Sequence, residues 1–243
     1  MFSTGKVKKI QAVVLGGSGQ VGSKLVASLQ RLSRDECGKI TLISRRPLNG
    51  FDDDDRVAVQ VVDYGKLGDA SVDKILQNHN AAFILMGIGQ PRKASQEEVE
   101  RIDADIPILF SEACTRNKVE HMSVLSAYGA DPKATYSSWT GTGAGGGWYN
   151  YCKGKMEEGI KALPFASIGI FQPAGIYPGN SNTPSLVGQL NAFLNPILPG
   201  AFETASSEQI ADSMVQLMKK QLAGIVTGQK TVTGGKAIKD SLN

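Results

Sequence analysis

The segment 148–155 (WYNYCKGK) contains two tyrosines that each precede a lysine by four residues, as Tyr149/Lys153 and Tyr151/Lys155. A spacing of four places both members of a pair on one face of a helix. A lysine ammonium beside a phenol favours the phenolate and lowers the pKa of the tyrosine. The tyrosine can then exchange a proton with a carbonyl or alcohol oxygen, so the segment predicts general acid–base chemistry.

Only one of the two pairs can face the interior of the protein. The apolar residues of the helix predicted for 148–163 recur every three to four positions, and the same stripe continued backwards reaches Lys153 and Tyr149. Tyr151 and Lys155 fall on another face, beside the charged residue Glu158, and we expect that face to be solvated. We therefore choose Tyr149 and Lys153 as the catalytic pair.

Ser126 is a third candidate catalytic residue, because it ends the apolar run 121–126 that precedes this helix. Ligands of parallel sheets bind at the carboxyl ends of the strands, where a serine hydroxyl can bond to a substrate carbonyl. Serine is also an ordinary turn-forming residue at such a position. Both interpretations of Ser126 stay open.

A glycine-rich loop, 16–22 (GGSGQVG), directly follows the apolar run Ile10–Leu15. Gly16, Gly19 and Gly22 permit a tight turn, let backbone N–H groups approach a diphosphate and let the next helix pack on the sheet. A bound anion then lies at the positive end of that helix. Because the loop connects a predicted strand to a predicted helix, it indicates a dinucleotide-binding site.

The residues after the second predicted strand bear on the choice of cofactor. NAD sites usually carry an acid here that holds the ribose hydroxyls. This chain instead has Ser44, Arg45 and Arg46, with no acidic residue before position 52. Two guanidiniums suit a 2′-phosphate, so we favour NADPH over NADH and Arg45 over Arg46 as the contact, although two arginines also occur in solvated turns. Asp63 and Tyr64, which end the third predicted strand, are placed to touch the adenine edge.

The segments that hold these residues alternate between strands and helices. This alternation predicts an α/β fold, a doubly wound Rossmann-type parallel sheet of order 3-2-1-4-5-6, as one domain over residues 1–243. We expect residues 176–243 to contribute the substrate pocket and a short strand near 230–233 to be a seventh strand. Pro107 lies inside a helix predicted for 96–117 and should bend it or leave a free carbonyl. The expected strands are 10–15, 39–44, 57–63, 81–87, 121–126 and 165–171, and the other expected helices are 67–77, 148–163 and 207–221.

Composition excludes several classes of protein. The 243 residues carry a formal charge of only +3, which is too small to indicate nucleic-acid or membrane binding. Three widely spaced cysteines argue against a disulfide framework or a zinc site, so we expect no metal. The polar N-terminus does not resemble a secretory signal, and we expect a cytoplasmic protein. Glycine, at 28 residues, is in excess, and five of these lie in 141–147, a candidate lid over the site.

The glycine loop, the strand-end serine and the tyrosine–lysine pair occur in the order that is typical of short-chain dehydrogenases/reductases. More narrowly, the chain resembles the atypical members in the HIV Tat-interacting protein oxidoreductase family. The segments that carry this resemblance are GGSGQVG (16–22), SRRP (44–47), VVDYGKL (61–67), VERIDADIPILFSEA (99–113), LSAYGAD (125–131), YNYCKGKMEE (149–158), FQPAGIYP (171–178) and KAIKDSL (236–242).

The resemblance implies that this chain binds NADP and that a loop after the sixth strand flanks the nicotinamide. The chain departs from the family at Ala127, where a second serine is common, and at Gln172, where arginine is frequent. The NADP contacts implied are Gly16, Ser18, Gly19, Gln20, Val21 and Arg45, then Leu85, Met86 and Gly87, and finally Pro173, Ala174 and Gly175.

Two functions follow from these residues. In the first, NADPH delivers a hydride to a carbonyl carbon, Tyr149 protonates the oxygen, Lys153 anchors the cofactor ribose and Ser126 polarises the carbonyl. In the second, suggested by Ala127, the protein binds NADPH without turnover, as a sensing or protein-interaction module. The first function implies an unidentified small carbonyl compound as substrate, and the second implies protein partners. We expect a monomer or a homodimer.

The cofactor assignment predicts the behaviour of Arg45→Ala. Loss of charge-assisted hydrogen bonds to a 2′-phosphate should weaken NADPH binding about tenfold to a hundredfold. Binding of NADH, which lacks that phosphate, should change little and serves as the internal control. Fluorescence titration with both cofactors measures the effect. A variant that kept the preference of the wild type for NADPH would show that Arg45 is not the contact.

Overall fold

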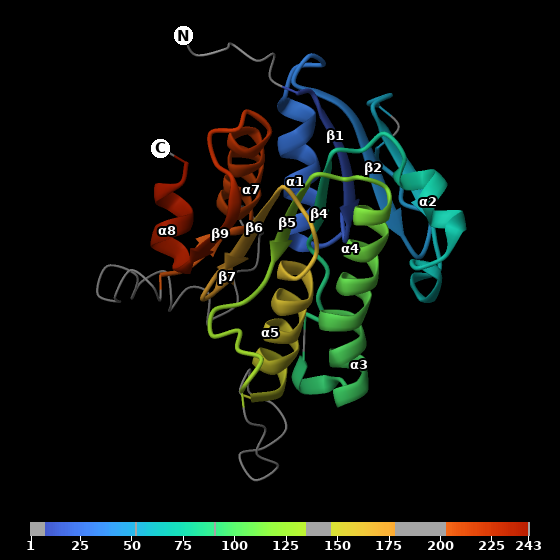
Figure 1. Ribbon diagram of the computed structural model, residues 1–243. Helices are drawn as coiled ribbons and strands as arrows, with labels where there is room; N and C mark the ends of the chain where they lie inside the picture. Colours follow the sequence, from blue (N-terminus) through green and yellow to red (C-terminus); the bar gives the residue numbers. More distant parts are fainter. Residues whose placement is uncertain (1–7, 52, 90, 135–146, 178–202, 243) are drawn as a thin grey trace.

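A seven-stranded parallel sheet forms the centre of the protein (Figure 1), in a computed structural model that describes residues 8–51, 53–89, 91–134, 147–177 and 203–242. The strand order is β3-β2-β1-β4-β5-β6-β9, which confirms the predicted order and the seventh strand. The strands are β1 (Ile10–Leu15), β2 (Cys37–Ser44), β3 (Val57–Val61), β4 (Ala81–Ile84), β5 (His121–Leu125), β6 (Ser167–Gln172) and β9 (Gly228–Thr233).

Helices cover both faces of the sheet. Helices α1 and α7 pack with one apolar core, and α2, α4 and α5 pack with a second core on the opposite face. The central strands are therefore buried on both sides, which explains why β1 and β4 are almost entirely apolar in sequence. The helices are α1 (Gln20–Arg31), α2 (Ala70–Leu76), α3 (Gln96–Glu100), α4 (Ile106–Arg116), α5 (Gly147–Lys161), α7 (Ser207–Leu222) and α8 (Gly234–Asp240).

The chain builds the sheet in one direction from β1 through β2 to β3 and then in the other direction from β4 onwards. The strand order therefore reverses between β1 and β4, which are neighbours in the sheet. At such a switch point the connections after the two strands diverge and leave a crevice at the carboxyl edge. The glycine loop follows β1 at this edge, and residues 85–87 follow β4. The topology therefore places two of the predicted cofactor-binding segments at the same crevice.

The helix predicted for 96–117, where we expected Pro107 to cause a bend or a free carbonyl, is interrupted by a π-helical turn. This turn, η3 (Arg101–Asp105), separates α3 from α4, and the N–H of Ile106 donates to the carbonyl of Arg101. Pro107, which has no N–H, then lies in the first turn of α4, where no such donor is needed. The wider turn accommodates the proline, and Asp103 of this turn is completely buried.

The C-terminal part adds elements that the sequence pattern did not predict. A small two-stranded parallel sheet pairs β7 (Ile176–Tyr177) with β8 (Ala205–Ser206), and α8 follows β9. The candidate lid 141–147 lies outside the described residues except for Gly147, the first residue of α5. No helix in the described part of the chain is long and apolar enough to cross a membrane. Two short 3₁₀ turns, η1 (Tyr64–Lys66) and η2 (Pro91–Lys93), complete the described elements.

His79 gives the fold a predictable dependence on pH. Its ring bonds through Nε2 to Thr41 Oγ1 (2.9 Å) and through Nδ1 to the carbonyl of Leu76 (3.0 Å). Burial lowers the pKa of His79 from 6.5 to about 4. Between these values the unfolded chain binds a proton that the folded chain does not, so stability falls as the pH falls.

We expect His79 to account for about 3 kcal/mol of unfolding free energy lost between pH 6.5 and pH 4. His79→Gln removes the titrating group and should flatten the profile by that amount, whatever its stability at neutral pH. Urea unfolding of both proteins across this range measures the difference, because other titrating groups contribute equally to each. Parallel profiles would contradict the assignment.

Candidate functional site

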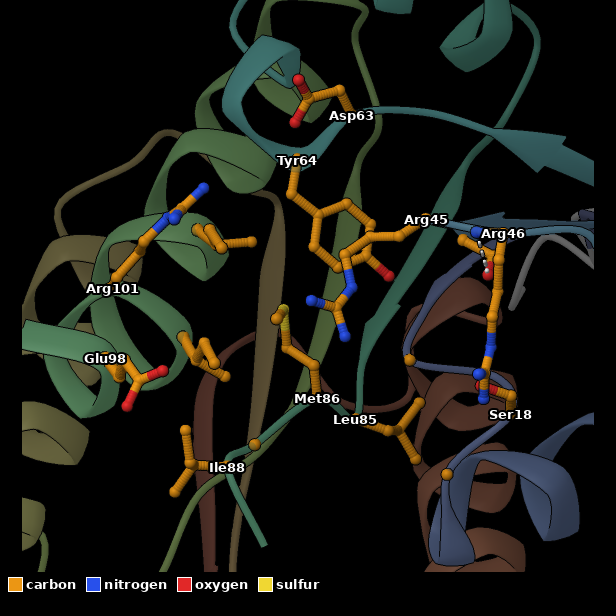
Figure 2. Close-up of a pocket in the computed structure, with 16 residues that line it drawn as sticks. Ser18, Arg45, Arg46, Asp63, Tyr64, Leu85, Met86, Ile88, Glu98 and Arg101 are labelled. Carbon is orange, nitrogen blue, oxygen red and sulfur yellow. Dashed lines mark hydrogen bonds between the residues drawn. The ribbon is translucent and has the colours of Figure 1, made fainter. Parts of the chain in front are cut away.

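A pocket of about 650 Å³ opens at the carboxyl edge of the first four strands (Figure 2). It brings together most of the residues that the sequence assigned to the cofactor. The predicted residues that line it are Gly16, Ser18, Gly19, Ser44, Arg45, Arg46, Asp63, Tyr64, Leu85, Met86 and Gly87. The wall that the sequence missed consists of Ile88, Glu98, Arg101, Ile102 and Ile106.

The missed wall comes from the connection after β4 and from the α3–η3–α4 segment. Figure 2 shows Glu98 and Arg101 on the side of the pocket opposite Ser18 and Arg46. The capping box formed by Ser95 and Glu98, in which each side chain bonds to the other residue's backbone N–H, starts α3. That box was readable as a helix start, but nothing in the sequence indicated that the helix faces the crevice.

The glycines of the loop are required by close backbone contacts. Gly16 has φ of +92°, and a Cβ there would lie 2.7 Å from the backbone N of Met86. A Cβ at Gly22 would lie 2.0 Å from the carbonyl oxygen of Gly16. Gly19 is the N-cap of α1 and provides no side-chain acceptor, so the first N–H groups of α1 are left for a ligand. This is the arrangement that holds a diphosphate.

Gln20, Val21, Lys153 and the loop 173–175, which the sequence also assigned to the cofactor, are not among the residues that line the pocket. Gln20 donates its side-chain amide to Ser207 Oγ (2.9 Å), and the side chain of Val21, in the first turn of α1, is buried. These two residues therefore offer only their backbone N–H groups at the start of the helix. In the loop, the carbonyls of Pro173 and Gly175 accept from Tyr128 N and Ala205 N, so Ala174 lies in a segment anchored on both sides.

The strand-end arginines face the pocket with their charge available. The Arg45 guanidinium carbon lies 5.6 Å from the centroid of the Tyr64 ring, a cation–π contact. Arg46 donates its backbone N–H to Ser44 Oγ (3.3 Å). Within the described part of the chain, neither guanidinium forms an ion pair with a carboxylate. Burial raises the pKa of Tyr64 although Arg45 opposes the shift, so this wall carries positive charge without a phenolate.

The structure separates the two tyrosine–lysine pairs as the helical stripe indicated. The side chain of Lys153 is 3% exposed, and its Nζ lies 5.9 Å from the centroid of the Tyr149 ring. Lys155 lies at the surface and pairs with Glu100 (2.7 Å) and Asp105 (2.8 Å). Tyr151 stacks on Trp148 with ring centroids 5.1 Å apart. Only Tyr149 and Lys153 are brought together inside the protein.

Lys153 has an ionic partner that the sequence did not reveal. Its Nζ lies 2.8 Å from Asp103 Oδ1, and it donates weakly to the carbonyl of Leu125 at 3.5 Å. The other carboxylate oxygen of Asp103 accepts the backbone N–H of Ile88 at 3.1 Å. Burial lowers the pKa of Lys153, but the carboxylate of Asp103 raises it, as does Tyr149 in its ionised form, and the net shift is upward. Lys153 is therefore an ammonium.

The direction of the Tyr149 shift corrects the expectation drawn from its neighbour alone. Burial raises the pKa of Tyr149, Lys153 lowers it and Asp103 raises it again, so the net pKa is above its ordinary value. Burial and the nearby carboxylate outweigh the ammonium. Tyr149 is therefore a protonated phenol at neutral pH, suited to donate a proton rather than to accept one.

The structure gives the hydroxyl of Ser126 a protein partner. Its hydroxyl donates to Glu157 Oε1 at 2.6 Å, and both residues are buried. The same oxygen accepts the side-chain amide of Gln172 at 2.7 Å, and Lys161 pairs with the other oxygen at 3.1 Å. Because its one hydroxyl proton is donated to Glu157, Ser126 does not polarise a substrate carbonyl in this arrangement.

Comparison with known proteins agrees with this architecture. A model of the NAD dependent epimerase/dehydratase family matches residues 12–175. A search of curated proteins finds no significant match. Solved structures with the same fold include MoeE5 in complex with UDP-glucuronic acid and NAD, which is 17% identical with a TM-score of 0.63 over 92% of this chain and 76% of that one.

Two further solved structures have a comparable likeness. The oxidoreductase ylbE from Lactococcus lactis is 16% identical with a TM-score of 0.62, over 96% of this chain and 95% of that one. UDP-glucuronic acid 4-epimerase from Bacillus cereus in complex with NAD is 16% identical with a TM-score of 0.62, over 93% and 78%. At such identities the likeness shows a shared fold.

The loop geometry predicts the effect of Gly22→Ala. Its Cβ would collide with the backbone of Gly16, so the loop must shift and the diphosphate site should be lost. We expect binding of dinucleotides to weaken at least about tenfold and stability to fall by about 1–3 kcal/mol. Gly65→Ala is the matched control, because the nearest atom to its Cβ lies at an ordinary 3.5 Å. Calorimetric titration and thermal unfolding measure both effects, and equal behaviour of the two variants would contradict the analysis.

Proposed function

Since the chain belongs to the NAD dependent epimerase/dehydratase family, we propose that it is an NADPH-dependent oxidoreductase that reduces a carbonyl substrate. The observation that carries this proposal is the shared pocket. It combines a glycine loop at an uncapped helix N-terminus with two arginines that have no carboxylate partner in the described residues. The resemblance of the sequence to the HIV Tat-interacting protein oxidoreductases favours the same activity.

The residues of the pocket fit an NADP molecule. A Cβ at Gly16 would lie 2.7 Å from the backbone N of Met86, so glycine at this position lets the loop pack closely against the end of β4. We assign the diphosphate to the backbone of 16–21, the 2′-phosphate to Arg45 and Arg46, and the adenine edge to Asp63 and Tyr64. Bound NADPH supplies the hydride. The choice of NADPH over NADH rests on the arginines and on the lack of an acid at that strand end.

The catalytic assignment uses Tyr149 and Lys153. The phenol of Tyr149 is held protonated and transfers its proton to the oxygen of the carbonyl as the carbon accepts the hydride. The phenolate that results is stabilised by the adjacent ammonium of Lys153, which also serves as a donor to the ribose hydroxyls of the cofactor. We propose that residues 173–175, anchored through their carbonyls, flank the nicotinamide.

A second candidate function is supported by Ser126. With its hydroxyl donated to Glu157 and alanine at position 127, the end of β5 lacks the donor that would polarise a carbonyl. A protein that binds NADPH without reducing a substrate, as a sensor or a docking module, would need no such donor. In that case Tyr149 would contribute to binding or partner contact and not to turnover.

Tyr149→Phe distinguishes these functions. Removal of a general acid should lower kcat for carbonyl reduction at least about a hundredfold and leave the Kd for NADPH within about twofold. Tyr151→Phe is the matched control, because it changes the tyrosine of the surface pair, and it should leave kcat unchanged. Steady-state oxidation of NADPH is measured with a panel of aldehydes, ketones and quinones.

Equal losses in the two variants, or no loss in Tyr149→Phe, would contradict the catalytic assignment. A wild-type protein that binds NADPH and oxidises it with none of the substrates would favour the second function.

A further inference from the structure

The π-helical turn η3 places a carboxylate in the interior of the protein. Asp103 is completely buried, while Asp105 of the same turn lies at the surface and pairs with Lys155. A carboxylate is expensive to remove from water and remains buried only where charge and hydrogen bonds compensate it. The contacts of Asp103 therefore indicate what compensates the burial of its charge.

Two groups hold the carboxylate, one from α5 and one from the connection after β4, and Gly87 leaves room for it. Asp103 Oδ1 lies 2.8 Å from Lys153 Nζ, and Oδ2 accepts the N–H of Ile88 at 3.1 Å. A Cβ at Gly87 would lie 3.0 Å from Asp103 Oδ1 and 3.8 Å from Lys153 Nζ, so a larger residue at 87 would crowd the pair. The ion pair is thus fixed against the strand ends where the proposed cofactor lies.

Stability alone does not account for this pair. Apolar residues of similar volume are often as stabilising as a buried ion pair, because both charges must be dehydrated. The surface pair Lys155–Asp105 ties the same helix α5 to the same turn without that cost. Apart from its burial, the pair of Lys153 and Asp103 differs from the surface pair because its lysine lies beside the ring of Tyr149.

We propose that Asp103 is a positioning residue for the reaction, because it holds the Lys153 ammonium at the strand ends and offsets its charge at Tyr149. Tyr149 then keeps its proton until a substrate oxygen accepts it. This inference rests on the proposed reductase function. It adds a direction to that function, since a tyrosine that stays protonated favours carbonyl reduction over alcohol oxidation.

The proton balance of the step is simple. Bound NADPH would supply the hydride and become NADP⁺. As the carbonyl carbon accepts the hydride, the O–H bond of Tyr149 breaks and a new O–H bond forms on the substrate oxygen. The phenolate left behind faces the ammonium of Lys153 and is reprotonated from water. Asp103 remains a carboxylate throughout and exchanges no proton.

The charged groups that act on Tyr149 come from two elements. Lys153 of its own helix α5 favours the phenolate, and Asp103 of the η3 turn disfavours it. Glu157 of α5 acts on Lys153 and adds to the negative charge around the ammonium. Removing the charge of Asp103 therefore leaves burial as the only one of these influences that opposes the ammonium at the phenol, and the pKa of Tyr149 should fall.

The test is the pH at which Tyr149 ionises in Asp103→Asn. Tyrosinate absorbance is titrated in the variant and in the wild type, and each curve is corrected with its Tyr149→Phe counterpart. We expect ionisation of Tyr149 to shift to lower pH by at least about one unit in Asp103→Asn. Asp105→Asn is the matched control on the same turn and should not shift it. An unchanged ionisation in Asp103→Asn would overturn the proposal.

A second measurement uses the wild type and does not depend on the variant folding. In an NMR spectrum of protein with isotopically labelled lysine, the ammonium protons of the buried Lys153 should exchange slowly with water and give a resonance at neutral pH. The same resonance should be missing in Lys153→Arg. Exchange as fast as that of exposed lysines would overturn the proposal. Both measurements need neither cofactor nor substrate, so failure of the reductase function would appear separately, as absence of NADPH oxidation by the wild type.

Discussion

The buried ion pair between Lys153 and Asp103 constrains the rest of the site, because two dehydrated charges must lie close together for either to remain in the interior. Their separation of 2.8 Å ties α5 to the π-helical turn, and the bond from Ile88 N to Asp103 ties that turn to the end of β4. Three segments far apart in the chain are thereby fixed at one edge of the sheet. Loss of either charge would leave its partner buried and unpaired.

The pocket and the buried ion pair next to it, behind Gly87, differ in their electrostatics. The end near β2 and β3 carries the guanidiniums of Arg45 and Arg46, which have no carboxylate partner in the described chain and suit an anion. The region at α5 holds an ammonium whose charge is offset by Asp103. The glycine loop with the open N-terminus of α1 lies between β1 and β4, where the strand order reverses. A dinucleotide with a phosphate at its adenosine end and an uncharged ring at its other end would match these two parts of the site.

Ser126 and Tyr149 each have a neighbour that the local sequence does not show. Ser126 was considered as an isolated hydroxyl, but Glu157, held also by Gln172 and Lys161, accepts its proton. The pKa of Tyr149 was judged from Lys153 alone, but burial and Asp103 outweigh the ammonium. In both cases the neighbour that matters lies on a different element. The chemistry that remains is proton donation by a neutral phenol, which agrees with the reductive direction that we propose.

The sequence by itself determined the local features. Alternating apolar runs predicted the order of the sheet, the GxxGxxG spacing predicted the loop, and the helical stripe placed Lys153 inward and Lys155 outward, because each depends on residues close together in the chain. Only the tertiary structure decided that Asp103 meets Lys153 and that α3 lines the pocket. Such contacts depend on how helices pack across the sheet, and the ionisation of a buried group is the sum of every charge around it.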